Sequence, residues 1–128
     1  MSALFTLTTG STTTDYTTKI QNGSWKVNNV DVQGSWTDSL LNTHPYVLRK
    51  QIKGTFTMLF LDILEAKAFI NAINTNKDVT TGLLPGVGLW AYNEQTFYSN
   101  KTMIFSYGEP ADTDPNGFVQ LQIQIQEV

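Results

Sequence analysis

Aliphatic residues and glutamines alternate without a break near the end of the chain, from Val119 to Gln126. A period of two is typical of a β-strand that buries one face. The pattern therefore predicts a strand over residues 118–126 that buries its aliphatic residues. Its other face carries Gln120, Gln122, Gln124 and Gln126. Strands that face water usually carry charged residues, which oppose pairing with other chains. The function therefore depends in part on what contacts this uncharged face.

The longest predicted strand, Val47–Leu61, leads directly into the one segment with helical periodicity. Asp62 is placed to cap a helix over residues 62–74, with Glu65 in the capping-box position. The helical stripe that would face the sheet consists of Ala66, Phe69, Ile70 and Ile73. Asn74 and Asn76 suit the end of this helix.

Turn signals divide the rest of the chain into short strands and loops. The predicted strands are Ala3–Thr9, Tyr16–Ile20, Ser24–Val27, Val30–Val32, Leu89–Tyr92, Thr96–Ser99 and Thr102–Tyr107. Turns are expected at Asn22-Gly23, Asn28-Asn29, Asn93-Glu94 and Asn100-Lys101, and loops at 10–15, 33–46 and 75–88. The sum is a mainly β fold, a β-sandwich or flattened barrel of about eight mostly antiparallel strands with one flanking helix. We expect one domain, 1–128, with a threonine-rich N-terminal arm at about 1–18.

The composition narrows the functional classes. Charged residues make up 15% of the 128 residues, against roughly 25% in ordinary soluble domains, and this favours a surface that packs against other proteins. The absence of cysteine excludes disulfides, thiolate zinc sites and thiol catalysis. The net charge of −3 with scattered basic residues argues against a phosphate-binding surface. The chain shows no signal peptide, and its longest apolar run, Met58–Leu61, is too short for a membrane span.

Candidate chemistry is sparse. Asp112, Asp114 and Asn116 match the start of a calcium loop, but the twelfth position holds Ile123 where a bidentate glutamate is needed. The same residues form an ordinary turn sequence before a strand. His44 is the single histidine and has no orienting partner at a local spacing. The pattern predicts a protein without enzymatic activity and without a cofactor.

An aromatic platform for sugars is the alternative function. Trp25, Trp36, Trp90, Tyr92 and Phe97 could stack on sugar rings in a carbohydrate-binding β-sandwich module. At strand positions such residues are more often part of the core. Trp36, within a polar segment, is the one expected to be exposed.

Three stretches, "LRKQIKGTFTMLFLDILEAKAFINAIN", "LWAYNEQTFYSNKTMIFSYGEP" and "FVQLQIQIQEV", give an order of elements that resembles small tail proteins of bacteriophages. This family contains tail-tube, distal-tail and tail-completion proteins, built on a β-sandwich with a flanking helix. The resemblance covers about residues 16–128 and leaves out the threonine-rich start. It implies a virion protein that is assembled in the bacterial cytoplasm. The resemblance further implies that the protein assembles into hexameric rings, and that these rings build or cap a tube. It also implies contacts with other tail or connector proteins, and DNA only as passing cargo without sequence recognition.

Subunit contacts are expected from the threonine-rich arm, the two long loops and the glutamine face. Long loops in small domains are often interfacial, and an arm with few large apolar residues needs an outside surface to become ordered. A covered glutamine face would explain the missing charges, although glutamines can also simply be solvated. The predicted interface residues are Phe5, Thr12, Tyr16, Trp36, His44, Leu83, Leu84, Gln120, Gln122 and Gln124.

Overall fold

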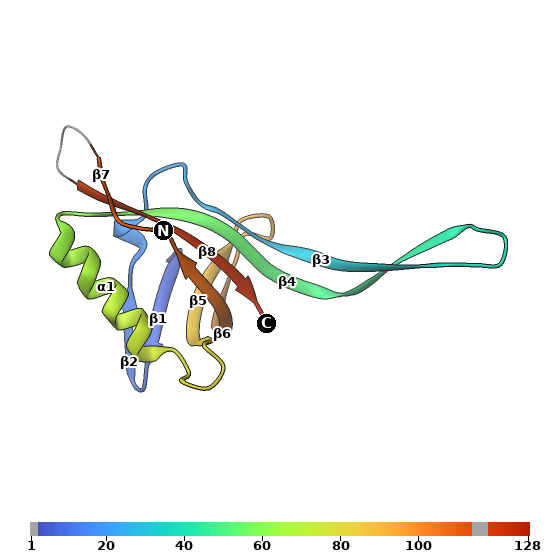
Figure 1. Cartoon of the computed structure of the whole chain (residues 1–128), viewed down its shortest axis with the longest axis horizontal. Coiled ribbons are helices and arrows are strands. Elements are labelled where there is room, and N and C mark those ends of the chain that lie inside the picture. Colours follow the sequence, from blue (N-terminus) through green and yellow to red (C-terminus); the bar gives the residue numbers. More distant parts are fainter. Residues whose placement is uncertain (1–2, 114–117) are drawn as a thin grey trace.

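The computed structural model describes residues 3–113 and 118–128, with the backbone alone at 33–34, 45–48 and 112–113. Eight strands and one α-helix account for most of these described residues (Figure 1). In chain order they are β1 (Phe5–Thr9), β2 (Thr12–Asp15), the 3₁₀ turn η1 (Thr17–Lys19), β3 (Lys26–Thr37), β4 (Thr43–Phe60), α1 (Ile63–Asn76), β5 (Leu84–Ala91), β6 (Thr96–Tyr107), β7 (Ala111–Thr113) and β8 (Phe118–Glu127).

All eight strands belong to one antiparallel sheet, in the order β2-β1-β5-β6-β8-β4-β3, with β7 paired to β8. The predicted mainly β class with a single helix is confirmed. The sheet stays open, with β2 and β3 as its edges, so it does not form a barrel. The turn after β5 nevertheless forms a backbone hydrogen bond with part of the β3 edge: the Tyr92 N–H donates to the Val27 carbonyl at 2.8 Å.

The hydrophobic core follows directly from the alternation along the strands. In β8 the buried side chains are Val119, Leu121, Ile123 and Ile125, as the period of two predicts. Phe5 from β1, Phe56 from β4, Phe105 from β6 and Phe69 from α1 meet in the same core. The Phe5 ring lies 5.4 Å from Phe56, 6.1 Å from Phe105 and 6.3 Å from Phe69, centroid to centroid. Two halves of the curved sheet and the helix therefore share one core.

The helix begins where the sequence predicts. The Asp62 side chain accepts a hydrogen bond from the Glu65 N–H at 2.9 Å, and α1 then covers the core with Ala66, Phe69 and Ile73. The Glu65 carboxylate pairs with Lys19 of η1. The capping-box role predicted for Glu65 is therefore replaced by an ion pair between the helix and η1. Within the described part of the chain, no helix combines the length and the apolar character needed to cross a membrane.

The N-terminal segment differs from the prediction. Phe5 is fully buried, and β1 pairs with β5 through Phe5↔Leu89, Thr6↔Gly88 and Leu7↔Val87. Residues 12–15 form a strand where a loop was expected, and 17–19 form a 3₁₀ turn where a strand was expected. The prediction of an arm that needs an outside surface is wrong for this segment, because β1 supplies the sheet with a strand and the core with Phe5.

The largest correction concerns residues 33–46, which were predicted to be a loop. They form the far end of a hairpin in which β3 and β4 pair from Lys26↔Thr55 to Thr37↔Thr43 (Figure 1). The expected turn at Asn28-Asn29 is absent, because both residues lie within β3. The turn expected at Asn100-Lys101 is a local irregularity within β6, with Asn100 in the left-handed region at φ 57°.

Candidate functional site: the hairpin arm

The β3–β4 hairpin extends far beyond the body of the molecule (Figure 1). The last pair between β4 and β8 is Lys53↔Gln126, after which β4 is paired with β3 alone. We define the arm as residues 30–51, from the pair Val30↔Gln51 to the tip. At about 3.3 Å per strand residue, the paired part of β3 in the arm is on the order of 25 Å long. A register shift between Val32 and Gln33 marks a bulge, a feature that increases strand twist.

The tip of the arm is an ordered turn organised by Asp38. Its Oδ1 accepts hydrogen bonds from the N–H groups of Leu40 at 2.9 Å and Asn42 at 3.0 Å. Its Oδ2 lies 2.9 Å from His44 Nε2, and the His44 ring stacks on Trp36 with centroids 4.3 Å apart. These hydrogen bonds, that of His44 first, hold the pKa of the Asp38 carboxyl below its usual value. The carboxylate is therefore the charged group that shapes the tip at neutral pH.

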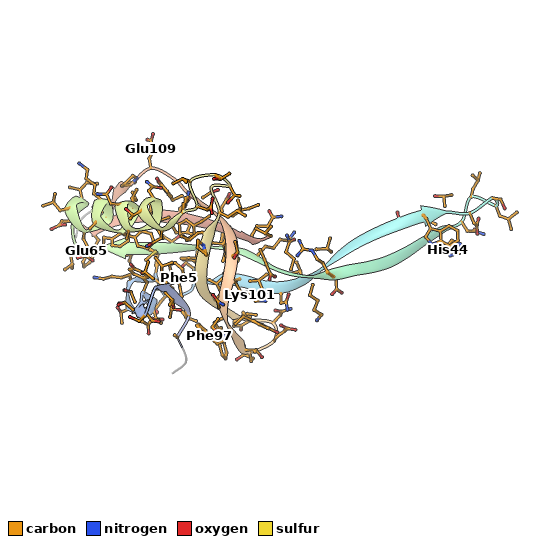
Figure 2. The ribbon with its side chains drawn as sticks, turned by 90° about the horizontal axis from the view of Figure 1, so that it is seen from below. Phe5, His44, Glu65, Phe97, Lys101 and Glu109 are labelled. Carbon is orange, nitrogen blue, oxygen red and sulfur yellow. The ribbon has the colours of Figure 1, made fainter. Side chains whose placement is uncertain are left out.

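The ordered tip presents large apolar side chains to solvent. Trp36 is 55% exposed, Leu40 79% and Leu41 83%, and Figure 2 shows the neighbouring His44 at the far end of the molecule. Leu41 also has a φ of 65°, in the left-handed region that favours glycine or asparagine. The backbone conformation of Leu41 is unfavourable for leucine, and it is held by the turn, in which the Leu41 N–H donates to the Asp38 carbonyl at 3.0 Å. The exposed Leu41 side chain remains available to a contact from outside the chain.

At its root the arm is joined to the body through β3 on one side. The Asn93 side chain, in the turn between β5 and β6, exchanges hydrogen bonds with Asn29: Asn29 N donates to Asn93 Oδ1 at 2.9 Å, and Asn93 Nδ2 donates to the Asn29 carbonyl at 2.8 Å. Glu94 Oε1 accepts from Asn29 Nδ2 at 2.8 Å and from the Tyr98 hydroxyl at 2.6 Å. These bonds, with Tyr98 the larger influence, lower the pKa of Glu94 below its usual value and keep it charged.

The other side of the root is joined through β4 to the end of β8. Glu127 Oε1 accepts from the Ile52 N–H at 3.1 Å, and the Glu127 carbonyl accepts from Gln51 Nε2 at 2.6 Å. Lys101 of β6 forms an ion pair with Glu127 Oε2 at 3.1 Å. Arg49 donates to the Val128 carbonyl at 2.9 Å. The root is thus bonded on both strands, in contrast to the exposed tip.

Three residues of the glutamine face, Gln122, Gln124 and Gln126, form the floor of a polar groove on the body. The register aligns Lys26, Thr55, Gln124 and Ser106 across β3, β4, β8 and β6. These four residues line two adjoining hollows of about 490 and 420 Å³. The described lining includes two lysines, Lys26 and Lys53, and contains no carboxylate. The face is therefore polar, weakly basic and concave, in a chain whose net charge is −3.

The structure separates the predicted interface residues into distinct groups. Phe5 and Leu84 are fully buried, and this corrects their assignment to an interface, because core side chains are not accessible to another subunit. Tyr16 is half-buried against Phe5 and Phe69, and Leu83 is half-buried before β5. Thr12 on edge strand β2, Trp36 at the tip, and Gln122 and Gln124 on the outer face of β8 are exposed. His44, stacked on Trp36, and Gln120 of β8 are half-buried.

The aromatic platform predicted for sugar binding does not assemble from the three tryptophans. Trp25 packs against Phe56 of the core in a tilted arrangement, with ring centroids 4.8 Å apart, and donates its indole N–H to the Trp90 carbonyl at 2.9 Å. Trp90 is half-buried, and Trp36 lies apart from both at the tip of the arm. Tyr92 is exposed and Phe97 half-buried near the turn after β5.

Of the predicted metal ligands, Asp114 and Asn116 lie outside the described residues, and so does the side chain of Asp112. Within the described residues, no group of histidine and carboxylate side chains has the arrangement of a metal site. Comparisons of the chain with protein-family models, with curated proteins and with solved structures found no match.

On the sequence alone, Asp38 and Glu94 fit turns, and Asp38 does close a turn through its own side chain. Sequence reasoning missed the exposed apolar pair Leu40 and Leu41 and the long-range contacts of Glu94 and Glu127. Glu94 and Glu127 act on residues more than 60 positions away, as the separations of 65 and 75 residues show. No local pattern could have indicated these contacts.

Proposed function

We propose that this chain is a non-enzymatic structural subunit of a phage tail or tail-like particle, which assembles with copies of itself into rings. The observation that carries the proposal is the arm, which presents an ordered apolar tip outside the body of the subunit. The resemblance of the element order to small tail proteins supplies the class of particle and the hexameric ring as its expected form.

The chemistry of the tip favours a protein partner. Trp36 is the kind of residue that dominates interface energies when a partner buries it. Leu40 and Leu41 add apolar surface whose burial is favourable. Asp38 fixes the turn that carries them, and a fixed turn loses little conformational entropy on binding.

A second copy of the chain is the partner that a ring requires. The arm leaves one end of the longest axis, while α1 begins at the opposite end (Figure 1). The start of α1 is also apolar and exposed at Leu61, Ile63 and Leu64. Two different surfaces at opposite ends of one subunit form a head-to-tail contact, which closes into a ring if the rotation per subunit closes.

The test removes the apolar tip and leaves the turn intact. Leu40→Ser combined with Leu41→Ser should leave a folded protein by circular dichroism but abolish ring formation. Sedimentation velocity and negative-stain microscopy of the full chain measure assembly. A matched control, Thr37→Ser, changes an exposed tip residue without removing a large apolar side chain and should leave the rings unchanged. An unmodified chain that remains monomeric at high concentration, or a double variant that still forms rings, contradicts the proposal.

A further inference from the structure

The arm is a two-stranded ribbon whose direction is set at its root. None of the described side chains from Asp31 to Lys50 is buried, and a two-stranded hairpin alone is only marginally stable in water. The bonds that tie the arm to the body lie at its root, at Asn29 on β3 and from Arg49 to Ile52 on β4. We propose that Glu94 and Glu127 are the positioning residues of the arm, which hold its two strands from opposite sides and fix the direction in which it leaves the body.

Glu94 joins three elements through one carboxylate. Its Oε1 accepts from Asn29 on β3 and from Tyr98 on β6, and its Oε2 lies 3.4 Å from Lys50 Nζ on β4. Asn29 is almost fully buried, with an exposed fraction of 9%. Hydrogen bonds to a charged acceptor are stronger than neutral ones, and one broken here would leave the buried Asn29 amide without its acceptor.

Glu127 performs the same task on the other strand. Its carboxylate accepts from the Ile52 backbone N–H and pairs with Lys101 of β6. Ile52 lies beside Lys53, the last β4 residue paired with β8. The carboxylate therefore satisfies a backbone donor at the position where the sheet no longer supplies one.

The two carboxylates belong to one connected network. Lys101 Nζ lies 5.3 Å from the centre of the Tyr98 ring, so that Glu94, Tyr98, Lys101 and Glu127 follow one another around the root. Strand β6 carries both central members, Tyr98 and Lys101. Networks of this kind specify one geometry when every member has its partner, and the arm then moves with β6 as one unit.

Acid should weaken the Glu94 half of this network. The groups that face Glu94 are Asn29, Lys50 and Tyr98, which all favour its charged form. Because its folded pKa lies below the usual value, its contribution is present at neutral pH and is lost as the pH falls below the usual glutamate pKa and through the lowered one. Glu94→Gln should remove this pH dependence.

The direction of the arm can be measured between two spin labels. The chain contains no cysteine, so Ser39→Cys at the tip and Lys67→Cys on α1 give a uniquely labelled protein, with both positions exposed. The labelled chain is diluted into an excess of the unlabelled double variant Leu40→Ser, Leu41→Ser, so that two labelled chains rarely meet. Pulsed electron paramagnetic resonance then reports the distance between the two labels within one molecule. We expect a single narrow distance peak, which is lost in Glu94→Gln and in Glu127→Gln. Glu109→Gln, at an exposed glutamate that points away from the body (Figure 2), should retain the narrow peak.

Tyr98→Phe provides a second measurement, because it keeps the ring and removes only the hydroxyl that donates to Glu94. It should broaden the peak while the melting temperature stays close to that of the unmodified chain. A peak that remains narrow in both glutamine variants, or one that is already broad in the unmodified chain, overturns the proposal. The consequence for ring assembly rests on the proposed function, but the distance measurement does not. If the unmodified chain forms no rings, the proposed function fails, while the peak widths still decide the role of Glu94 and Glu127.

Discussion

The body and the arm of this protein are held in their conformations by different interactions. In the body, Phe5, Phe56 and Leu121 are buried in a core shared by the sheet and the helix. In the arm, the described side chains beyond Gln51 are exposed or half-buried, and order comes from strand pairing, the Asp38 turn and the network at the root. Burial stabilises the body, whereas directional polar bonds hold the arm.

Because of this difference, we expect the body to determine the stability of the protein and the arm to determine what the protein binds. A change in the core of the body should act on the whole fold, since β1, β3, β4, β5, β6, β8 and α1 all contribute to one core. A change in the arm should leave the fold in place and alter what the chain can bind. Variants of matched chemistry in the two regions therefore test whether the arm is a functional appendage or a part of the folding unit.

The largest difference should appear between two aromatic truncations. Phe56→Ala removes a buried ring that contacts Phe5 and Trp25 and should lower the free energy of unfolding by about 3–5 kcal/mol. Trp36→Ala removes a larger but exposed ring whose aromatic partner is His44, with an expected effect below about 1.5 kcal/mol. Urea unfolding followed by circular dichroism measures both. Equal losses would mean that the tip is part of the cooperative fold.

The border between the two regions should be sensitive to backbone spacing. A methyl group on Gly54 would lie 2.0 Å from the Lys26 carbonyl oxygen and 2.6 Å from the Val27 Cα, both backbone atoms of the paired strand. Gly54→Ala should therefore force β3 and β4 apart and cost about 1–3 kcal/mol of stability. Gly108→Ala is the control, because its added methyl group meets nothing within 4 Å. A neutral Gly54→Ala in the same unfolding experiment would mean that the root tolerates a wider strand spacing.

The sequence predicted those helices and strands that bury one face in the hydrophobic core. The alternation in β8 and the stripe of α1 reflect burial on one side, and burial leaves a period that can be read along the chain. Asp62 was found for a similar reason, because a helix cap acts over three residues.

The arm could not be predicted in this way, since a ribbon without a buried face has no hydrophobic period. The Asn28-Asn29 pair indicated a turn, yet the Asn28 side chain accepts from the Asn93 N–H and the Asn29 side chain donates to Glu94, each partner 65 positions away. Phe5 was assigned to an interface because the strands that cover it, such as β4 and β6, come from distant parts of the chain. Of the site itself, Trp36 and His44 were identified as candidates, but their stacking depends on the turn that closes the hairpin.

The smallest effect on stability, and the clearest separation of the two regions, should come from Leu41. Its left-handed backbone disfavours leucine by roughly 1–2 kcal/mol relative to a residue suited to that conformation. Leu41→Asn, which keeps a side chain and tolerates the conformation, should leave the melting temperature unchanged or raise it slightly. The gain is limited because the tip can open without unfolding the body. The same variant removes an apolar side chain that is 83% exposed, so ring formation in sedimentation experiments should weaken. Leu64→Asn makes the same chemical change on α1, where the backbone is helical, and should lower the melting temperature slightly. If the Leu41→Asn protein is less stable yet assembles normally, then Leu41 stabilises the fold and the tip is not part of the assembly surface.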